Sequence, residues 1–442
     1  MIRDILAIGL WSVVAVLVTY TLRHYLFTLN RVFGRQRQPY VDIGVGDWPR
    51  VAVYVPCHNE EKVIGGMLDA LLGNDYPADR FYVVPIDDRS TDGTRQIIED
   101  YTARFPGRIR PFIRSEGKPG KAAALSDATR EAEAEVLMVF DADYLPGPNL
   151  LRQLAAPFFD PEVGAVMGRV VPHNLNRTLL TRLLDLERSG GYQVDQQARM
   201  NLRLIPQYGG TVGGVRRSAL RDVGHWNEDA LAEDTDMTYR LILRGWQVVY
   251  QNRSECYEEV PETWPTRIRQ IQRWTRGHNQ CLRNYAFPLL GIPRHLRFAQ
   301  VIDGVLLLGV FAVAPVLLLG WGLATALYFM GYEIRPGLIV LFAVASYSTL
   351  GNFAAFFEVA TAVRLDGSRN RVRLLPFVAL GFLVNLLAVS RATLSRRSWL
   401  APAAAGPTWE KTERYRAGND NAANHAAGHD TAGGPAGGGQ PS

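Results

Sequence analysis

The chain has 442 residues, a formal net charge of +5 and 47% hydrophobic residues. This length accommodates one large catalytic domain with additional segments, and we expect no nucleic-acid partner. The three cysteines, Cys57, Cys256 and Cys281, lie far apart and match no metal-binding spacing. They exclude a disulfide-rich secreted domain and are typical of reduced cytosolic thiols.

Four long apolar segments predict a membrane protein. About 20 apolar residues are needed for a helix to cross the hydrocarbon core of a bilayer. One such segment could be a buried core helix, but four favour membrane embedding. A lone acid, Glu358, lies in the third, where it faces either a polar path or the membrane interface. The segments are Ile5–Leu22, Gly304–Met330, Leu338–Val363 and Leu374–Ser390.

The first segment predicts an uncleaved N-terminal transmembrane anchor within residues 1–30. No small-residue cleavage pattern follows it, and the arginines after it place that side in the cytoplasm. We therefore expect a multi-pass protein of the inner (plasma) membrane with a cytoplasmic catalytic domain. Residues 301–392 predict the C-terminal transmembrane helices, although arginines on both sides of the last span leave three or four crossings open. The N-terminal arginines are Arg23, Arg31, Arg35 and Arg37.

Residues 48–260 alternate between apolar strands and amphipathic helices. The clearest strands are Val51–Pro56, Phe81–Asp87 and Val136–Asp141. Continuous apolar strands that alternate with helices predict an α/β domain with a mostly parallel sheet covered on both faces. Ligands of such sheets bind at the carboxyl ends of the strands.

Acidic side chains follow all three strands at that edge. Glu60 follows the first, Asp87 and Asp88 end the second, and Asp141 and Asp143 end the third. Asp87 and Asp88 could accept hydrogen bonds from a nucleoside, or simply begin a helix. Asp141 and Asp143 could hold a divalent cation on a diphosphate, or lie in a solvated turn.

Three further groups of residues suggest catalytic chemistry or binding of a phosphate. Lys118 and Lys121 precede a helix and suit phosphate, although the surrounding residues do not form a Walker motif. Asp234 lies in the stretch AEDTD at a helix start, where it is either a general base or a partner of the helix dipole. Residues 261–300 contain QIQRW and predict interfacial helices. Gln270, Arg273 and Trp274 share one helical face there, suited to phosphate and a sugar ring.

The order VPCHNEE, DDRSTDGT, FDAD, EDTD and QIQRW resembles the membrane-embedded inverting family-2 glycosyltransferases. That branch includes cellulose synthase-like, mannan synthase-like, hyaluronan and poly-N-acetylglucosamine synthases. The resemblance implies a GT-A type fold over residues 48–260, a UDP-sugar or GDP-sugar donor, and Mg²⁺ or Mn²⁺ on Asp141 and Asp143. It implies that Asp234 is the base and that a glycan or lipid is the acceptor. The implied donor nucleotide site consists of Glu60, Asp87, Asp88, Lys118, Lys121 and Asp141. The implied diphosphate and acceptor site consists of Gln270, Arg273 and Trp274.

Three functions fit these motifs. A processive β-glycan synthase is our main expectation, and a non-processive glycolipid synthase acting on diacylglycerol or ceramide is the alternative. A non-catalytic nucleotide-sugar binding protein is disfavoured, because every acidic motif is retained. Residues 405–442 predict a cytosolic end motif, WEKTER, and a disordered tail. The sequence does not indicate the donor sugar or the oligomeric state.

Overall fold

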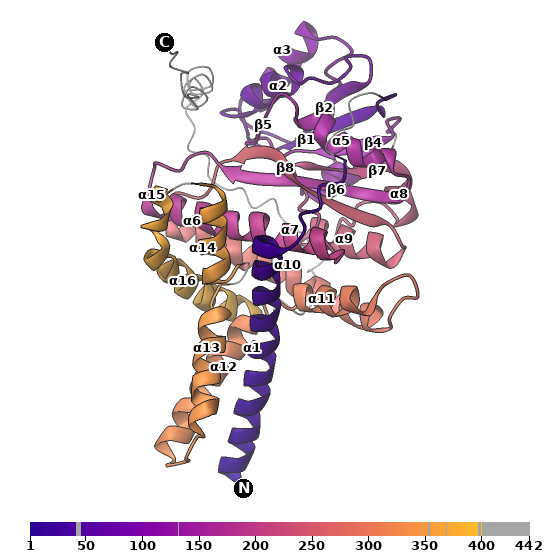
Figure 1. Ribbon diagram of the computed structural model, residues 1–442. Coiled ribbons are helices and arrows are strands. Elements are labelled where there is room, and N and C mark those ends of the chain that lie inside the picture. The colour runs from indigo at the N-terminus through magenta and orange to yellow at the C-terminus, as the bar shows by residue number, and fades with distance from the viewer. Residues whose placement is uncertain (41–45, 131, 352–353, 368, 397–398, 400–442) are drawn as a thin grey trace, which may run out of the picture.

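The computed structural model describes residues 1–40, 46–130, 132–351, 354–367, 369–396 and 399. A sheet with surrounding helices forms one end of the molecule, and long helices extend away from it (Figure 1). The expectations for the segment 405–442, including its WEKTER motif, lie outside the described residues.

Eight strands form one sheet in the described part of the chain, in the order β3-β2-β1-β4-β7-β6-β8-β5. The pairs β1–β2, β2–β3, β1–β4 and β6–β8 are parallel, so the predicted mostly parallel sheet is confirmed. The strands are β1 Val51–Cys57, β2 Phe81–Asp88, β3 Phe112–Arg114, β4 Val136–Val139, β5 Leu145–Pro146, β6 Val163–Pro172, β7 Gly213–Arg216 and β8 Gln247–Glu258.

The first half of the sheet follows the predicted alternation of strand and helix. Every residue of β1, β2 and β4 is buried, as continuous apolar strands covered on both faces should be. The helices of this half are α2 Ile64–Leu72, α3 Thr94–Arg104 and α4 Lys121–Thr129.

The second half of the sheet contains antiparallel pairs that the sequence pattern did not indicate. β7 runs antiparallel between β4 and β6, and its first residue, Gly213, pairs with Val139 at the end of β4. The loop before β7 therefore lies beside Asp141 and Asp143. The small helices of this half are α5 Leu150–Ala155, η1 Ala156–Phe159, α8 Arg217–Asp222 and α9 Glu233–Leu243.

A second layer of helices lies between the sheet and the long apolar helices (Figure 1). The π-helix η2 continues α6 without a break and leads into α7, and the 27-residue α10 carries QIQRW. π-helices are rare in proteins, and those that occur are frequently found at functional sites. These elements are α6 Leu179–Ser189, η2 Gly190–Gln196, α7 Gln197–Leu202 and α10 Trp264–Leu290.

The long helices α1, α12 and α13 pack side by side and extend away from the sheet (Figure 1). Two described helices, α1 and α16, are long and apolar enough to cross a membrane, and α11 with α12 would add a third although they are bent by 73°. The remaining helices are α1 Ile2–Phe33, α11 Phe298–Leu308, α12 Val313–Phe329, α13 Pro336–Ser348, α14 Phe356–Leu365, α15 Arg369–Val372 and α16 Leu375–Leu394.

Two of the four predicted spans are interrupted. Gly304–Met330 is divided between α11 and α12, and Leu338–Val363 is divided between the 13-residue α13 and the 10-residue α14. Pro315, within the first of these, follows the bend, and a proline disfavours an uninterrupted helix. The division of residues 301–392 into membrane crossings stays a prediction.

Candidate active site

The carboxyl ends of β1, β2 and β4 bring the predicted acidic residues to one edge of the sheet. Cys57 at the end of β1 pairs with Asp87 at the end of β2, so both strand ends reach the same level. Asp87 is buried and accepts a hydrogen bond from the backbone N–H of Ser90 at 3.1 Å. Glu60 is also buried, and its backbone N–H donates to the Thr94 hydroxyl at 2.7 Å.

Asp88 is held by cations of the protein itself. One oxygen, Oδ1, lies 2.8 Å from Arg114 and 2.9 Å from Arg89. The other oxygen accepts the backbone N–H of Gly120 at 3.2 Å. Asp88 therefore fixes the loop before α4. Its role in donor binding stays a prediction, and a bound donor would have to share this carboxylate with Arg114 and Arg89.

Lys121, the first residue of α4, connects three parts of the site. Its ammonium lies 2.7 Å from Asp141 and 3.4 Å from Glu233, and it donates to the carbonyl of Gly210 at 2.9 Å. Burial opposes the charge on this ammonium, but the Asp141 and Glu233 carboxylates outweigh burial and raise the pKa of Lys121. The Lys121 ammonium thus contacts both the FDAD motif after β4 and the EDTD motif at the start of α9.

The glycine-rich loop before β7 approaches the EDTD motif closely. Gly210 has a φ of +70°, and a Cβ placed on it would come within 3.0 Å of the Asp234 Cβ. A larger residue would therefore be strained and would displace the carboxylate. The glycine-rich loop is the part of Gly209–Gly214 that precedes β7.

Asp234 lies in the first turn of α9 and is partly buried. Its Oδ1 accepts the backbone N–H of Thr235 at 2.6 Å. Burial and the neighbouring Glu233 carboxylate raise the pKa of Asp234 to about 6. A carboxylate with this pKa is a better proton acceptor than an exposed aspartate, as a general base near neutral pH requires.

Asp141 and Asp143 provide oxygen ligands of the kind that Mg²⁺ and Mn²⁺ bind. Asp143 is buried, with 3% of its surface exposed, whereas Asp141 is partly exposed and contacts Lys121. The backbone N–H of Asp141 donates to the Thr211 hydroxyl at 3.0 Å, which fixes the strand end against the glycine-rich loop. The chemistry of these residues fits a divalent cation.

Lys118 lies apart from this cluster. Its ammonium pairs with Asp229 at 3.0 Å, and both side chains are largely exposed. Lys118 lines a wide surface hollow with a volume of about 680 Å³, together with Arg130 and Trp226. The structure therefore brings Lys121, but not Lys118, to the acidic edge, and the role of Lys118 stays a prediction.

The QIQRW residues lie on α10 among arginines. The Gln270 side-chain oxygen accepts from Arg267 at 2.9 Å. The guanidinium carbons of Arg188 and Arg267 lie 5.1 and 5.4 Å from the ring centre of Trp274. Arg273 is partly buried on the same helix. Trp274 thus contacts cations here, and its stacking on an acceptor sugar stays a prediction.

Three polar residues that the sequence did not single out form a chain near this helix. Arg188 donates to Glu258 at 2.7 Å, and the Tyr144 hydroxyl donates to the other Glu258 oxygen at 3.0 Å. Glu258 ends β8, so the rule that singled out the acids after β1, β2 and β4 could have found it. Tyr144 directly follows Asp143, and the chain therefore links the FDADY motif to the surroundings of Trp274.

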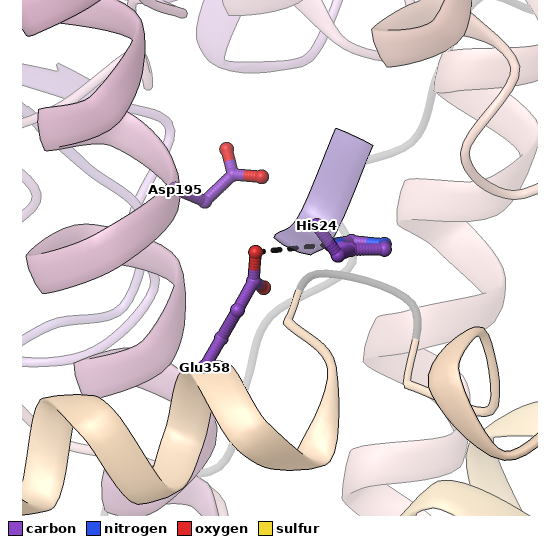
Figure 2. Close-up of side chains that lie close together, drawn as sticks. All are labelled: His24, Asp195 and Glu358. Carbon is purple, nitrogen blue, oxygen red and sulfur yellow. Dashed lines mark hydrogen bonds and ion pairs between the residues drawn. The ribbon is translucent and has the colours of Figure 1, made fainter. Parts of the chain in front are cut away.

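A second buried polar cluster lies where α1 meets the helical layer. Figure 2 shows His24, Asp195 and Glu358 converging from α1, η2 and α14, with ligand atoms that all lie within 4.8 Å of one another. His24 Nδ1 is 3.0 Å from Glu358. Asp195 contacts Arg199 and lies 3.4 Å from Arg23.

These ion pairs explain the cluster without a metal. Asp303 of α11 contacts Arg23 at 2.8 Å and Arg199 at 3.2 Å, so two guanidinium groups lie among three carboxylates. Buried charges are normally paired in this way. We interpret the cluster as an ion-pair network that joins α1 to η2, α7, α11 and α14. Arg23 therefore belongs to the packed interior, whereas the sequence had suggested a charge flanking the membrane.

Comparison with known proteins agrees with this architecture. The family model described as glycosyltransferase like family 2 matches residues 49–277. The probable glycosyltransferase YdaM of Bacillus subtilis (strain 168) is 32% identical over 267 residues, which are 60% of this chain and 62% of that protein. Glucomannan 4-beta-mannosyltransferase 7 of Arabidopsis thaliana is 28% identical over 254 residues, covering 56% and 46% of the two chains.

The chain spans between 46% and 62% of the length of these two curated relatives. Among solved structures, the mannosyltransferase PcManGT from Pyrobaculum calidifontis, in complex with GDP-Man and Mn²⁺, has a TM-score of 0.57 and 20% identity. The match covers 88% of this chain and 99% of that chain, and it shows a shared fold. The expected GT-A fold is therefore confirmed, and the chain belongs to glycosyltransferase family 2.

Proposed function

We propose that this protein transfers a sugar from a nucleotide sugar to a hydroxyl acceptor, with inversion of the anomeric carbon. One observation supports this proposal above the others: Lys121 joins Asp141 to the helix start that contains Glu233 and Asp234. A group suited to the donor diphosphate and a group suited to the acceptor hydroxyl thus belong to one site.

In the proposed reaction, Asp234 removes the proton from the acceptor hydroxyl. Its raised pKa suits this task, because general-base catalysis works best with a pKa near the working pH. The acceptor oxygen attacks the anomeric carbon from the face opposite the diphosphate. A single displacement of this kind converts an α-linked donor into a β-glycoside.

The remaining residues stabilise the departing diphosphate and hold the donor. A divalent cation on Asp141 and Asp143 would neutralise part of the diphosphate charge when bound. Arg273 would supply a planar fork for phosphate oxygens, and Asp87 would accept hydrogen bonds from the nucleoside. These roles are proposals that follow from the family motifs and the positions of the residues.

We propose a growing β-linked polysaccharide as the product. The curated relatives include proteins named glucomannan 4-beta-mannosyltransferases, which supports a polysaccharide product. PcManGT was solved with GDP-Man, so GDP-mannose is the first donor to test. The candidate spans α1 and α16 support a location in the inner membrane, with membrane lipids around them. Multi-pass topology with a cytoplasmic catalytic domain is part of this proposal, and a glycolipid product remains the alternative.

The test uses membranes that contain the full chain. We would incubate them with radiolabelled GDP-mannose, UDP-glucose and UDP-N-acetylglucosamine in turn, and measure nucleotide release and labelled product. A product of many sugars that stays in the aqueous phase supports the proposal. Label that moves entirely into chloroform as a lipid with one or two sugars supports the glycolipid alternative. Release of no nucleotide from any donor would contradict the proposed activity.

A further inference from the structure

The hydroxyl of Thr235, directly beside Asp234, has two competing hydrogen-bond acceptors. It already accepts a hydrogen bond from the Gln207 side chain at 2.8 Å. Its own hydrogen can go to Asp234 Oδ1 or to His278 Nε2, and both atoms lie 3.4 Å away. The two possible bonds have different consequences for Asp234.

His278 comes from α10 and is buried, with 6% of its surface exposed. Phe311 packs against the ring at 4.8 Å between ring centres, and Nδ1 has no hydrogen-bond partner among the described residues. Nε2 faces two donor groups, the Thr235 hydroxyl and the Gln207 amide nitrogen at 3.5 Å. This arrangement favours a neutral ring whose Nε2 has no hydrogen and accepts. In agreement, burial lowers the pKa of His278 to about 4.

We propose that His278 is a positioning residue for sugar transfer: its Nε2 accepts the Thr235 hydroxyl hydrogen and so keeps that hydrogen away from Asp234. The inference rests on the proposed function, because it assumes that Asp234 is the base. Each hydrogen bond to a carboxylate stabilises its charged form and lowers its pKa. Asp234 Oδ1 already accepts the Thr235 backbone N–H, and a second bond from the same residue would make it a weaker base.

Gln207 is fixed in turn by the π-helix η2. The Gln196 side chain donates to the Gln207 carbonyl at 2.9 Å and accepts the Gln207 backbone N–H at 3.1 Å. The Gln207 side chain therefore has a defined direction, and its donation occupies one acceptor position of the Thr235 hydroxyl, whose own hydrogen is available to His278 or Asp234. The π-helix thus holds the outer part of the arrangement around the base.

Other ionisable groups also act on Asp234 and must stay constant in a test. Glu233 raises its pKa and Lys121 lowers it. Three further groups interact with it electrostatically: Tyr192 of η2, Tyr208 of the loop after α7, and Cys281 of α10. The test therefore changes only His278 and Thr235, neither of which carries charge near neutral pH.

The experiment compares four variants of the full chain in membranes. The readout is the pH dependence of nucleotide release from GDP-mannose or, if that donor is inactive, from the active UDP-sugar. His278→Leu removes the acceptor, so the Thr235 hydroxyl turns to Asp234. We expect the acidic limb of the kcat profile to move about one unit lower in pH, because a hydrogen bond to a charged group has about that effect. The plateau rate should fall about 3- to 10-fold at unchanged donor KM, since a weaker base accepts the proton less readily.

Three further variants separate this role from a structural one. His278→Gln places a side-chain oxygen near the former Nε2 and should restore the wild-type acidic limb. Thr235→Val removes the hydroxyl, and in that background His278→Leu should leave the acidic limb where it was. If the leucine variant does not fold, His278→Met, whose thioether is only a weak acceptor, replaces it with the same expected shift and the same overturning result.

An acidic limb of His278→Leu that superimposes on the wild type would overturn the inference. So would a shift of the same size in the Thr235→Val background. If Asp234→Asn abolishes transfer while the His278 variants give either of these two results, the inference about His278 fails and the proposed function stands. If Asp234→Asn keeps full turnover, the base assignment fails as well.

Discussion

The ammonium of Lys121 lies 2.7 Å from a carboxylate oxygen of Asp141, and this contact is the centre of the site. The same ammonium reaches Glu233, beside Asp234, and the carbonyl of Gly210 in the glycine-rich loop. Three motifs that are separated by up to about ninety residues in the sequence are therefore held together by one cation.

Replacement of Lys121 should damage the site more than replacement of Lys118. In Lys121→Met, Asp141 and Glu233 lose their shared cation, and we expect kcat/KM to fall about 10- to 100-fold, the range for hydrogen bonds to charged groups. Lys118→Met breaks only an exposed pair with Asp229 and should have an effect about threefold or smaller. Arg95→Met, which breaks an exposed pair with Glu99, is the matched control. Steady-state kinetics would contradict this order if Lys118→Met proved the more damaging change.

Chelation should abolish activity if Asp141 and Asp143 hold a divalent cation. EDTA is expected to stop nucleotide release from the active donor, and an excess of Mg²⁺ or Mn²⁺ should restore it. Asp143→Ala should stay inactive at any concentration of either metal. The cluster around His24 provides the control: Glu358→Gln should leave the metal response unchanged, because we interpret that cluster as ion pairs. Full activity in EDTA would show that no metal is needed.

The pH–rate profile should have an acidic limb near pH 6. The base must be ionised to accept a proton, and burial together with Glu233 raises the pKa of Asp234 to about 6. Activity should therefore be full above this pKa and fall about tenfold per pH unit below it. Assays from pH 4.5 to 8 at saturating donor would measure the limb. A limb near pH 4 would indicate that Asp234 titrates as an ordinary exposed aspartate.

Loss of Arg23 should destabilise the junction of α1 with η2 and α11. Arg23→Met leaves Asp195 and Asp303 buried with one cation fewer, and breaking a buried pair in this way costs about 3 to 5 kcal/mol. We expect a large drop in the unfolding temperature of the detergent-purified protein. Arg35→Met changes an exposed arginine on the same side and should unfold like the wild type. Equal unfolding temperatures would show that the ion pairs contribute little.

The sequence predicted the first half of the sheet and its acidic edge because local patterns determine them. Apolar strands such as Val51–Pro56 end in polar residues, and parallel strands must place those ends together. It could not predict that Lys121 would reach Asp141 and Glu233, because these contacts depend on how separate elements pack together, as does the antiparallel pairing of β7 with β4. No local pattern specifies such a long-range pairing.

The sequence pattern also could not predict the buried ion-pair cluster around Arg23 and Glu358, for a related reason. Arg23 and Glu358 each resemble a charge beside a membrane when only their neighbours in the chain are considered. Their ion-pair partners, Asp303 and His24, are 280 and 334 residues away in the chain. Likewise, Leu338–Val363 is apolar enough for one span, but the structure divides it between α13 and α14, and Glu358 on α14 contacts His24.

The proposal that Asp234 is the base of a sugar transfer is tested most directly by Asp234→Asn, with transfer and donor binding measured on the same membranes. The account predicts that labelled product falls about 10²- to 10⁴-fold, whereas binding of GDP-mannose or the active donor stays near the wild-type level. The variant should unfold at the same temperature or higher near pH 7.5, because the partly buried aspartate carries a destabilising charge above its raised pKa. Asp229→Asn, which changes an exposed acid in the segment before α9, should transfer sugar normally. An asparagine variant that binds the donor and still forms more than a few per cent of the wild-type product would contradict the account.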